Sequence, residues 1–151
     1  MNLRPIALRP LLAITVNVEP PVDLGDGRRV IPFSGGTFTG PDGVSGVLTE
    51  GGADWQQQRA DGTLEIDAHY TLRSDDLDYI EVRSTGLRCA SGEVTARLGR
   101  GEAVEADEYY FRTHVRLFTT APRLARLNDI LCVSTGQRDR DRVLIHVHEV
   151  L

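Results

Sequence analysis

Apolar and polar residues alternate with a period of two along most of the chain. Between residues 64 and 72 every even position is apolar or aromatic, whereas every odd position is polar. The alternation recurs at residues 12–18, 79–84, 108–118 and 143–150. Because successive side chains of a strand point to opposite faces, this pattern predicts β-strands with one buried face.

Turn signals separate the alternating segments at short intervals. They fall at residues 25–27, 41–43, 51–52, 61–62 and 91–92, and each of them contains glycine. Asp-Gly pairs are favoured where a tight hairpin needs a positive φ angle. Short strands with frequent turns are typical of an antiparallel sandwich or barrel and not of a parallel α/β sheet.

One short helix is predicted, at residues 121–128. Pro122 suits its first turn, and Leu124 and Leu127 lie three positions apart. The 151 residues contain no linker, low-complexity stretch or repeat, so we expect a single domain covering residues 1–151. The predicted fold is all-β, a single antiparallel barrel of about eight to ten strands whose lumen can hold one small ligand.

The charge and the cysteine content indicate which binding partners and which cellular location to expect. The net charge is −5 and the arginines are scattered among acids, which leaves no cationic stripe for nucleic acid. The apolar run at residues 11–18 is short and contains Thr15 and Asn17, so neither a signal segment nor a membrane span is expected. Cys89 and Cys132 form no paired motif and are expected to be free thiols. We therefore predict a cytoplasmic protein, with self-association an open question.

A glycine-rich segment covers residues 34–41 and is followed by Gly46. A phosphate-binding loop would need a helix directly after it and a Lys-Ser/Thr pair, and both are missing. Dense glycines in a strand favour a bend, a bulge or a close backbone approach. We interpret this segment as structural, with the ring of Phe38 as a candidate for stacking on a ligand.

Three polar or aromatic residues, Asp54, Trp55 and Gln56, directly follow a double glycine and Ala53. A loop that places an acid, an indole and an amide side by side is typical of the mouth of a ligand site. The alternative, equally weighted, is that the single Trp is a core residue. We include all three residues as candidate site residues, with Asp54 as a candidate acid or base.

Polar side chains also gather on one face of two predicted strands. They are Asp67, His69, Tyr110, Arg112 and His114. If these faces point into the barrel, Asp67 can transfer protons and Arg112 can bind an anionic or carbonyl oxygen, with the other three contacting the ligand. The alternative is a solvated outer face, which alternation by itself favours for Asp67 and His69.

The histidines and cysteines predict neither a metal site nor a nucleophile. His146 and His148 lie two apart on one strand face, a spacing compatible with ligation, but no further ligand is tied to them by a motif. No nucleophile elbow is present, and neither cysteine lies in an activating context. We therefore expect no metal and no cofactor.

Four motifs spread over nearly the whole chain are specific in combination. They are Gly35-Gly36, Gly51-Gly52-Ala53-Asp54-Trp55-Gln56, Asp67-Ala68-His69-Tyr70 and Tyr109-Tyr110-Phe111-Arg112-Thr113. Together they resemble the DUF3237 (UPF0311) family of small bacterial proteins of unknown function. The chain departs from the family pattern at Thr119, at Arg126 and in the segment 114–116.

The resemblance implies a lipocalin-like (calycin-like) β-barrel, in agreement with the strand pattern. It also implies a pocket shared by Asp54, Trp55, Asp67 and Arg112. It implies little about activity.

Three functions are compatible with these residues. The leading hypothesis is a cofactor-independent enzyme, a lyase, isomerase, cyclase or hydratase acting on a small oxygenated organic molecule. In it, Asp67 or Asp54 is the general acid or base and Arg112 stabilises a developing enolate or carboxylate. The alternatives are a non-catalytic barrel in which Phe38, Trp55 and Tyr110 stack on the ligand, and a structural oligomer with a filled lumen.

Overall fold

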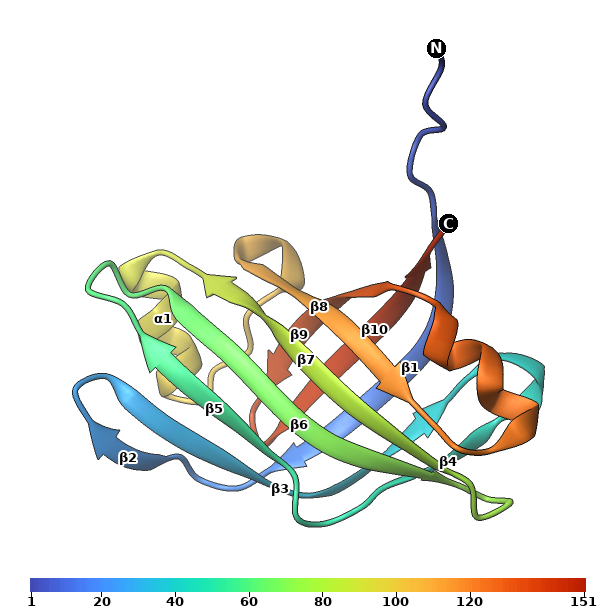
Figure 1. The fold of residues 1–151 in the computed structure, drawn as a ribbon. Helices are drawn as coiled ribbons and strands as arrows, with labels where there is room; N and C mark the ends of the chain where they lie inside the picture. The colour runs from blue at the N-terminus through green and yellow to red at the C-terminus, as the bar shows by residue number, and fades with distance from the viewer.

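A computed structural model describes all residues, 1–151, and places ten strands in one antiparallel sheet that closes on itself (Figure 1). The strands are β1 (Leu8–Val18), β2 (Val22–Gly25), β3 (Arg28–Thr39), β4 (Ser45–Leu48), β5 (Ala53–Gln58), β6 (Leu64–Ser74), β7 (Tyr79–Cys89), β8 (Tyr110–Phe118), β9 (Cys132–Asp139) and β10 (Arg142–Val150). β1 pairs with both β10 and β3, which joins the two edges of the sheet. The predicted antiparallel β-barrel is confirmed.

Two positions of the barrel are each shared by two short strands. β4 and β5 follow one another between β3 and β6, and β2 takes over beside β3 where β1 ends. The ten strands therefore occupy eight positions, a number at which a barrel interior is just wide enough for side chains or one small ligand.

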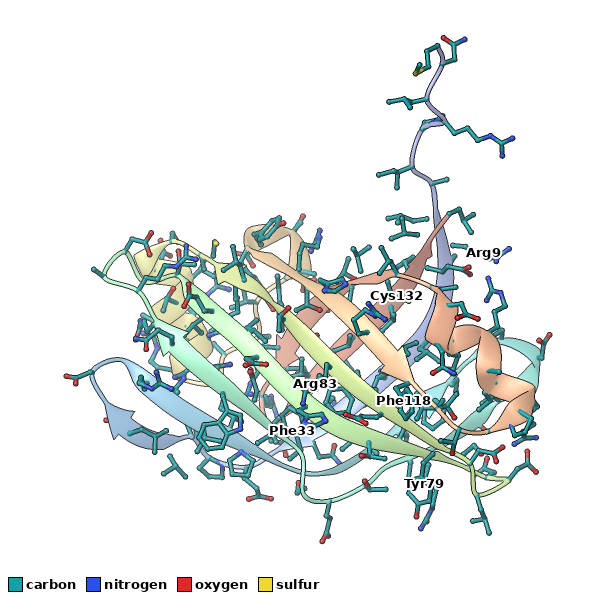
Figure 2. All side chains as sticks on the ribbon, in the orientation of Figure 1. Arg9, Phe33, Tyr79, Arg83, Phe118 and Cys132 are labelled. Carbon is teal, nitrogen blue, oxygen red and sulfur yellow. The ribbon has the colours of Figure 1, made fainter.

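Each strand divides its side chains between the lumen and the solvent. In β6, the buried residues are Leu64, Ile66, Ala68, Tyr70, Leu72 and Ser74, and those between them are exposed or half-buried. β8 alternates in the same way, with its odd-numbered positions buried. In Figure 2, Arg83 and Phe118 mark the outer face of β7 and β8, whereas the ring of Phe33 is buried inside.

The two ends of the barrel are built differently (Figure 1). A cluster of 19 buried residues extends through the interior, and at one end its members, which include Phe38, Leu72 and Leu127, fill the lumen. Leu127 belongs to η3 (Pro122–Asp129), a 3₁₀-helix at the place where the sequence predicts a helix. Phe38 is therefore a core residue at the filled end. Two further single-turn 3₁₀-helices are η1 (Pro41–Gly43) and η2 (Ala106–Glu108).

The opposite end is covered by a helix that the sequence pattern does not predict, α1 (Gly92–Gly99). It begins after Ser91, whose Oγ accepts a hydrogen bond from the backbone N–H of Val94 at 3.2 Å. Val94 and Leu98 pack into a second apolar cluster with residues of β6 and β8. The prediction of a simple turn at residues 91–92 is therefore wrong, because these residues cap and start a helix.

No helix of the chain is long and apolar enough to span a bilayer.

The glycine-rich segment lies within β3 and β4, as its structural interpretation requires. Gly36 has a φ angle of +150°, and a Cβ atom there would lie 2.0 Å from the carbonyl oxygen of Thr15. β1 and β3 pair at this point, so the glycine permits the close approach that closes the barrel.

One buried carboxylate ties three separate segments together. Glu149 in β10 is 4% exposed and accepts hydrogen bonds from Arg9 in β1, at 2.9 Å, and from Arg126 in η3. These two arginines hold the pKa of Glu149 at about 2, below the ordinary value of 4.5. The ion triad therefore fixes the first strand and η3 to the last strand.

Replacing Glu149 by Gln is expected to lower the free energy of unfolding by about 1 kcal/mol near neutral pH, since water screens the two half-exposed arginines. Because the pKa of Glu149 is lower in the folded than in the unfolded protein, its ionised carboxylate stabilises the fold at pH values above the unfolded-state pKa of about 4.5. That contribution is lost as the pH falls from about 4.5 toward 2. Denaturant unfolding at several pH values should therefore show wild type and variant converging in acid. A difference that stays constant in acid would contradict this expectation. Glu65→Gln, which breaks an exposed pair, is the matched control.

Candidate functional site

A cavity of about 270 Å³ occupies the lumen at the end covered by α1. Half of its 24 lining residues are hydrophobic, and Leu98 of α1 is among them. The exposed lining residues Pro21, Gln58 and Gly99 mark where the cavity opens to solvent. A partly apolar chamber with a few convergent polar groups is the usual form of a small-molecule site.

A carboxyl group, an amide and a guanidinium form a chain of hydrogen bonds in this cavity. The Nε of Arg29 donates to Oε1 of Gln56 at 2.7 Å, and Nε2 of Gln56 donates to Oδ2 of Asp54 at 2.6 Å. The other carboxyl oxygen of Asp54 accepts a hydrogen bond from the backbone N–H of Asp67 at 3.1 Å. Asp54 and Gln56 are less than a tenth exposed. The carboxyl is thus held in one orientation.

Opposing effects act on the protonation of Asp54. Burial raises its pKa, because a charged carboxylate is poorly solvated in the lumen. Hydrogen bonds from Gln56 and the Asp67 backbone lower it, and so do the charges of Arg29 and Arg88. The net direction is upward. A raised pKa makes the Asp54 carboxylate a stronger base than an ordinary aspartate, which suits a group that takes up a proton in acid–base catalysis.

Three hydroxyl groups line the cavity in a row across β7, β8 and β9. Ser84 Oγ donates to Thr113 Oγ1 at 2.7 Å, and Thr113 Oγ1 lies 2.6 Å from Ser134 Oγ. Three hydroxyls have three protons to donate, and two are used within the row. One donor therefore remains for a bound oxygen atom or a water molecule.

Tyr70 forms part of the wall close to Asp54. Its side chain is 3% exposed and packs edge-to-face on Phe33, with ring centroids 5.5 Å apart. Burial and the nearby charge of Asp54 both raise the pKa of the Tyr70 phenol. Tyr70 therefore stays protonated and offers the cavity a hydroxyl donor.

Three arginines, Arg29, Arg88 and Arg138, line the same cavity. Burial lowers the pKa of each, and for Arg88 the value is about 10, with the charges of Arg29 and Arg138 lowering it further. A guanidinium group stays protonated in proteins, so all three carry a positive charge. Asp54 is the one acidic residue of the lining, so the cavity has a net positive charge.

The structure brings together two of the residues predicted from the sequence. Asp54 and Gln56 point into the lumen and line the cavity, whereas Phe38 is absent from its wall. Trp55 lies between them in β5 and therefore points outward, with 53% of its surface exposed. It lies opposite Asp67 of β6, and both line a shallow recess on the outer face.

The polar faces of β6 and β8 do not point into the barrel, and the hypothesis of an enclosed set built from them is wrong. Asp67 and His69 are exposed, so the alternative of a solvated outer face is confirmed for them. Nε2 of His69 lies 2.7 Å from Oε1 of Glu81 on the same outer surface. The physical reason is that the apolar residues at the even positions of β6 fill the lumen.

The residues of β8 follow the same rule. Tyr110, Arg112 and His114 are exposed and share an outer recess, with the guanidinium carbon of Arg112 5.4 Å from the centroid of the Tyr110 ring. The register places His114 opposite Thr85, and Thr85 opposite Asp67, on this outer surface. These groups lie on the opposite side of the sheet from Asp54.

Sequence reasoning missed the arginines and the hydroxyl row. Arg88 follows Ile80, Val82 and Ser84 at even positions of β7, the positions that face the lumen. Arg29 and Arg138 occupy the inward positions of β3 and β9 in the same way. A charged residue on the apolar face of a strand was the signal available in the sequence.

No group of three or more His, Cys, Asp and Glu side chains converges in a way that could hold a metal ion. His146 is exposed on β10, and His148 is partly exposed beside it. Both cysteines are free, and burial raises the pKa of Cys132 to about 11. Cys132 is therefore a protonated core residue at neutral pH.

Taken together, the closed sheet and its partly polar lumen define a small β-barrel with an internal cavity. The family described as "Protein of unknown function (DUF3237)" matches residues 6–150, and the chain belongs to this family. A UPF0311 protein of Rhodopseudomonas palustris is 38% identical over 130 residues, covering 85% of this chain and 84% of that protein. A UPF0311 protein of Clostridium acetobutylicum is 29% identical over 154 residues, covering 99% and 97%.

Solved structures have the same fold. A conserved protein of unknown function from Rhodopseudomonas palustris matches with a TM-score of 0.94 and 34% identity, over 99% of this chain and 100% of that one. A β-barrel-like protein from Acinetobacter baumannii matches with a TM-score of 0.84 and 32% identity, over 99% of both chains. An enzyme from Penicillium herquei matches over the full length of both chains, with a TM-score of 0.72, and at 19% identity this likeness concerns the fold alone.

The Asp54 carboxyl is expected to titrate above the ordinary aspartate value of 3.8. Because the charge of Arg88 lowers this pKa, Arg88→Met should raise it further, whereas Met at the exposed Arg116 should leave it unchanged. Carbon-13 NMR of the carboxyl group across a pH series measures the value, and Asp54→Asn assigns the signal. A wild-type value at or below 3.8, or equal effects of the two arginine variants, would contradict the expectation.

Proposed function

We propose that the barrel binds a small oxygenated organic molecule in its lumen and acts on it as a cofactor-independent acid–base enzyme of the lyase or isomerase type. The observation that carries this proposal is the buried Asp54 carboxyl, oriented by Gln56 and the Asp67 backbone inside a cavity. Buried carboxyls with a raised pKa are concentrated at catalytic sites, since folding alone gives no reason to keep them. Asp54 thus takes the role that the sequence assigned to Asp67 or Asp54.

In the proposed reaction, the Asp54 carboxylate removes a proton from a carbon next to a substrate carbonyl group. The C–H bond breaks, its electron pair enters the carbonyl system, and an enolate forms. An isomerase then returns the proton from Asp54 to another atom of the enolate, whereas a lyase expels a leaving group that takes up the proton. Both routes regenerate the carboxylate and need no oxidant or reductant.

The enolate oxygen needs a donor that is already in position before the reaction. Ser84 and Asp54 are both cross-strand neighbours of Ala68, whose small side chain leaves space between them. Because Ser84 donates to Thr113, the free proton of the hydroxyl row is on Thr113 or Ser134, and Tyr70 offers another donor. A preorganised donor of this kind stabilises developing negative charge more than water does.

A non-catalytic binding barrel is the second candidate, and the apolar half of the cavity lining favours it. Under this alternative, the polar groups orient a ligand without transferring a proton. The structural-oligomer alternative assumed a filled lumen, which the cavity at the α1 end contradicts. Self-association and a cytoplasmic location both stay predictions.

Proton transfer can be measured before the product is identified. A panel of small hydroxy, oxo and unsaturated acids, incubated with the protein in D₂O, should include members that gain deuterium or change structure, as followed by NMR and mass spectrometry. Asp54→Asn should lower the rate by about 10²- to 10⁴-fold, the usual contribution of a general base. Binding of the same compound should persist in this variant.

The matched comparison is Asp67→Asn, which changes the exposed carboxyl on the neighbouring strand. If Asp67→Asn abolishes exchange while Asp54→Asn does not, the active carboxyl is on the outer face and the proposal is wrong. Compounds that bind in the lumen but gain no deuterium would favour the binding barrel.

A further inference from the structure

The three cavity arginines come from strands that lie apart in the barrel. Arg29 lies near the start of β3, Arg88 near the end of β7, and Arg138 near the end of β9. Their charges nevertheless act on one another, since Arg29 lowers the pKa of both Arg88 and Arg138. Arg88 lies opposite Leu64, and Leu64 lies opposite the exposed Gln58 at the opening. The arginines thus gather in one space near the entrance.

Protein groups leave most of these guanidinium donors unused. Arg29 donates to Gln56, but the guanidinium groups of Arg88 and Arg138 form neither a hydrogen bond nor an ion pair with the protein. Many surface arginines of the chain do have carboxylate partners, such as Arg59 with Glu65. Asp141, in the turn after β9, raises the pKa of Arg138 without forming an ion pair.

The charge balance of the cavity is opposite to that of the whole chain. The chain carries a net charge of −5, whereas the cavity lining has three arginines and one acid, a balance of +2 when Asp54 is ionised. Like charges held together in a partly desolvated space destabilise the empty protein. Apolar residues of similar volume would not carry this cost, so the arrangement indicates a ligand that supplies the missing negative charge.

We propose that the lumen binds an organic dianion, with its two negative charges on Arg88, Arg138 and Arg29 and its apolar body against the hydrophobic wall. This proposal rests on the lumen being the functional site and specifies its substrate class. Arginine is suited to this role because its planar donor fork matches carboxylate and phosphate oxygens. Phe111 and Ile66 are among the apolar residues available to the body of the ligand.

Two kinds of ligand fit this description, a dicarboxylate and a phosphate monoester. Both carry two negative charges on oxygen atoms attached to a small carbon skeleton. With the charged groups held near the opening, the carbon skeleton extends toward Asp54 and the hydroxyl row deeper in the barrel. The arginines then provide binding energy away from the reacting atoms, and Asp54 acts on the uncharged part of the molecule.

Titration calorimetry of the full chain in phosphate-free buffer tests this inference with four aromatic probes: phthalate, phenyl phosphate, benzoate and benzyl alcohol. The two dianions should bind at least about tenfold more tightly than benzoate, with benzyl alcohol weakest, and added salt should weaken their binding. Tighter binding of phthalate identifies a dicarboxylate, and tighter binding of phenyl phosphate identifies a phosphate ester. Equal binding of all four probes would overturn the proposal.

Arg88→Met should weaken dianion binding by about tenfold or more, with a smaller loss for Arg88→Lys, which keeps the charge. Arg116→Met is the matched control, since Arg116 is exposed on the outer face of β8. Circular dichroism and thermal unfolding establish that each variant is folded. Unchanged binding in folded Arg88→Met, or an equal loss in Arg116→Met, would overturn the proposal.

Asp54→Asn separates this inference from the proposed catalysis. The variant removes a negative charge from the cavity, so it should bind phthalate at least as tightly as the wild type does. Dianion binding by the wild type, with no proton transfer on any compound of the panel, would support the ligand class and count against the enzyme. Proton transfer on neutral compounds only would support the enzyme and overturn the ligand class.

Discussion

Closure of the sheet through the pairing of β1 with β3 is the constraint on which the rest of the structure depends. Once the sheet is closed, every side chain on a strand lies either in a narrow lumen or on the outer surface, with no edge between them. Gly36 permits this pairing because a larger residue would meet the backbone of β1. In the closed barrel, the alternation along each strand therefore determines which side chains face the lumen and can lie in the same cavity.

The two ends of the barrel interior differ: one is filled by packed side chains, and the other holds the cavity with its charged and polar groups. At the η3 end, aliphatic and aromatic side chains fill the space, and their burial stabilises the fold. At the α1 end, Ala68 and Ser84 are too small to fill the lumen, and a polar cavity remains between them and the arginines. Keeping charged groups in that space costs stability, because charges are poorly solvated there.

The same division explains which sequence predictions succeeded. The strands, the barrel and the helix near residues 121–128 follow from local alternation and turn chemistry, which do not depend on the partner of each strand. α1 was missed because it is only two turns long, and its cap, Ser91-Gly92, has the same composition as a turn. Asp54 and Gln56 were found through their motif, whereas Arg88 was missed because it lies inside an apparently apolar strand face.

The pattern along the chain was enough to predict an antiparallel barrel, the family and a carboxyl–amide pair in β5. Which face of each strand lies inside followed only from how the strands pair around the barrel. Alternation shows that two faces differ, but a lone strand does not reveal whether polar residues beside apolar ones line a chamber or face water. In this barrel, the larger apolar residues of β6 and β8 face the lumen, and Asp67 and Arg112 therefore lie on the outer surface. It also brought Arg29, Arg88 and Arg138, which are far apart in sequence, to the same cavity as Asp54.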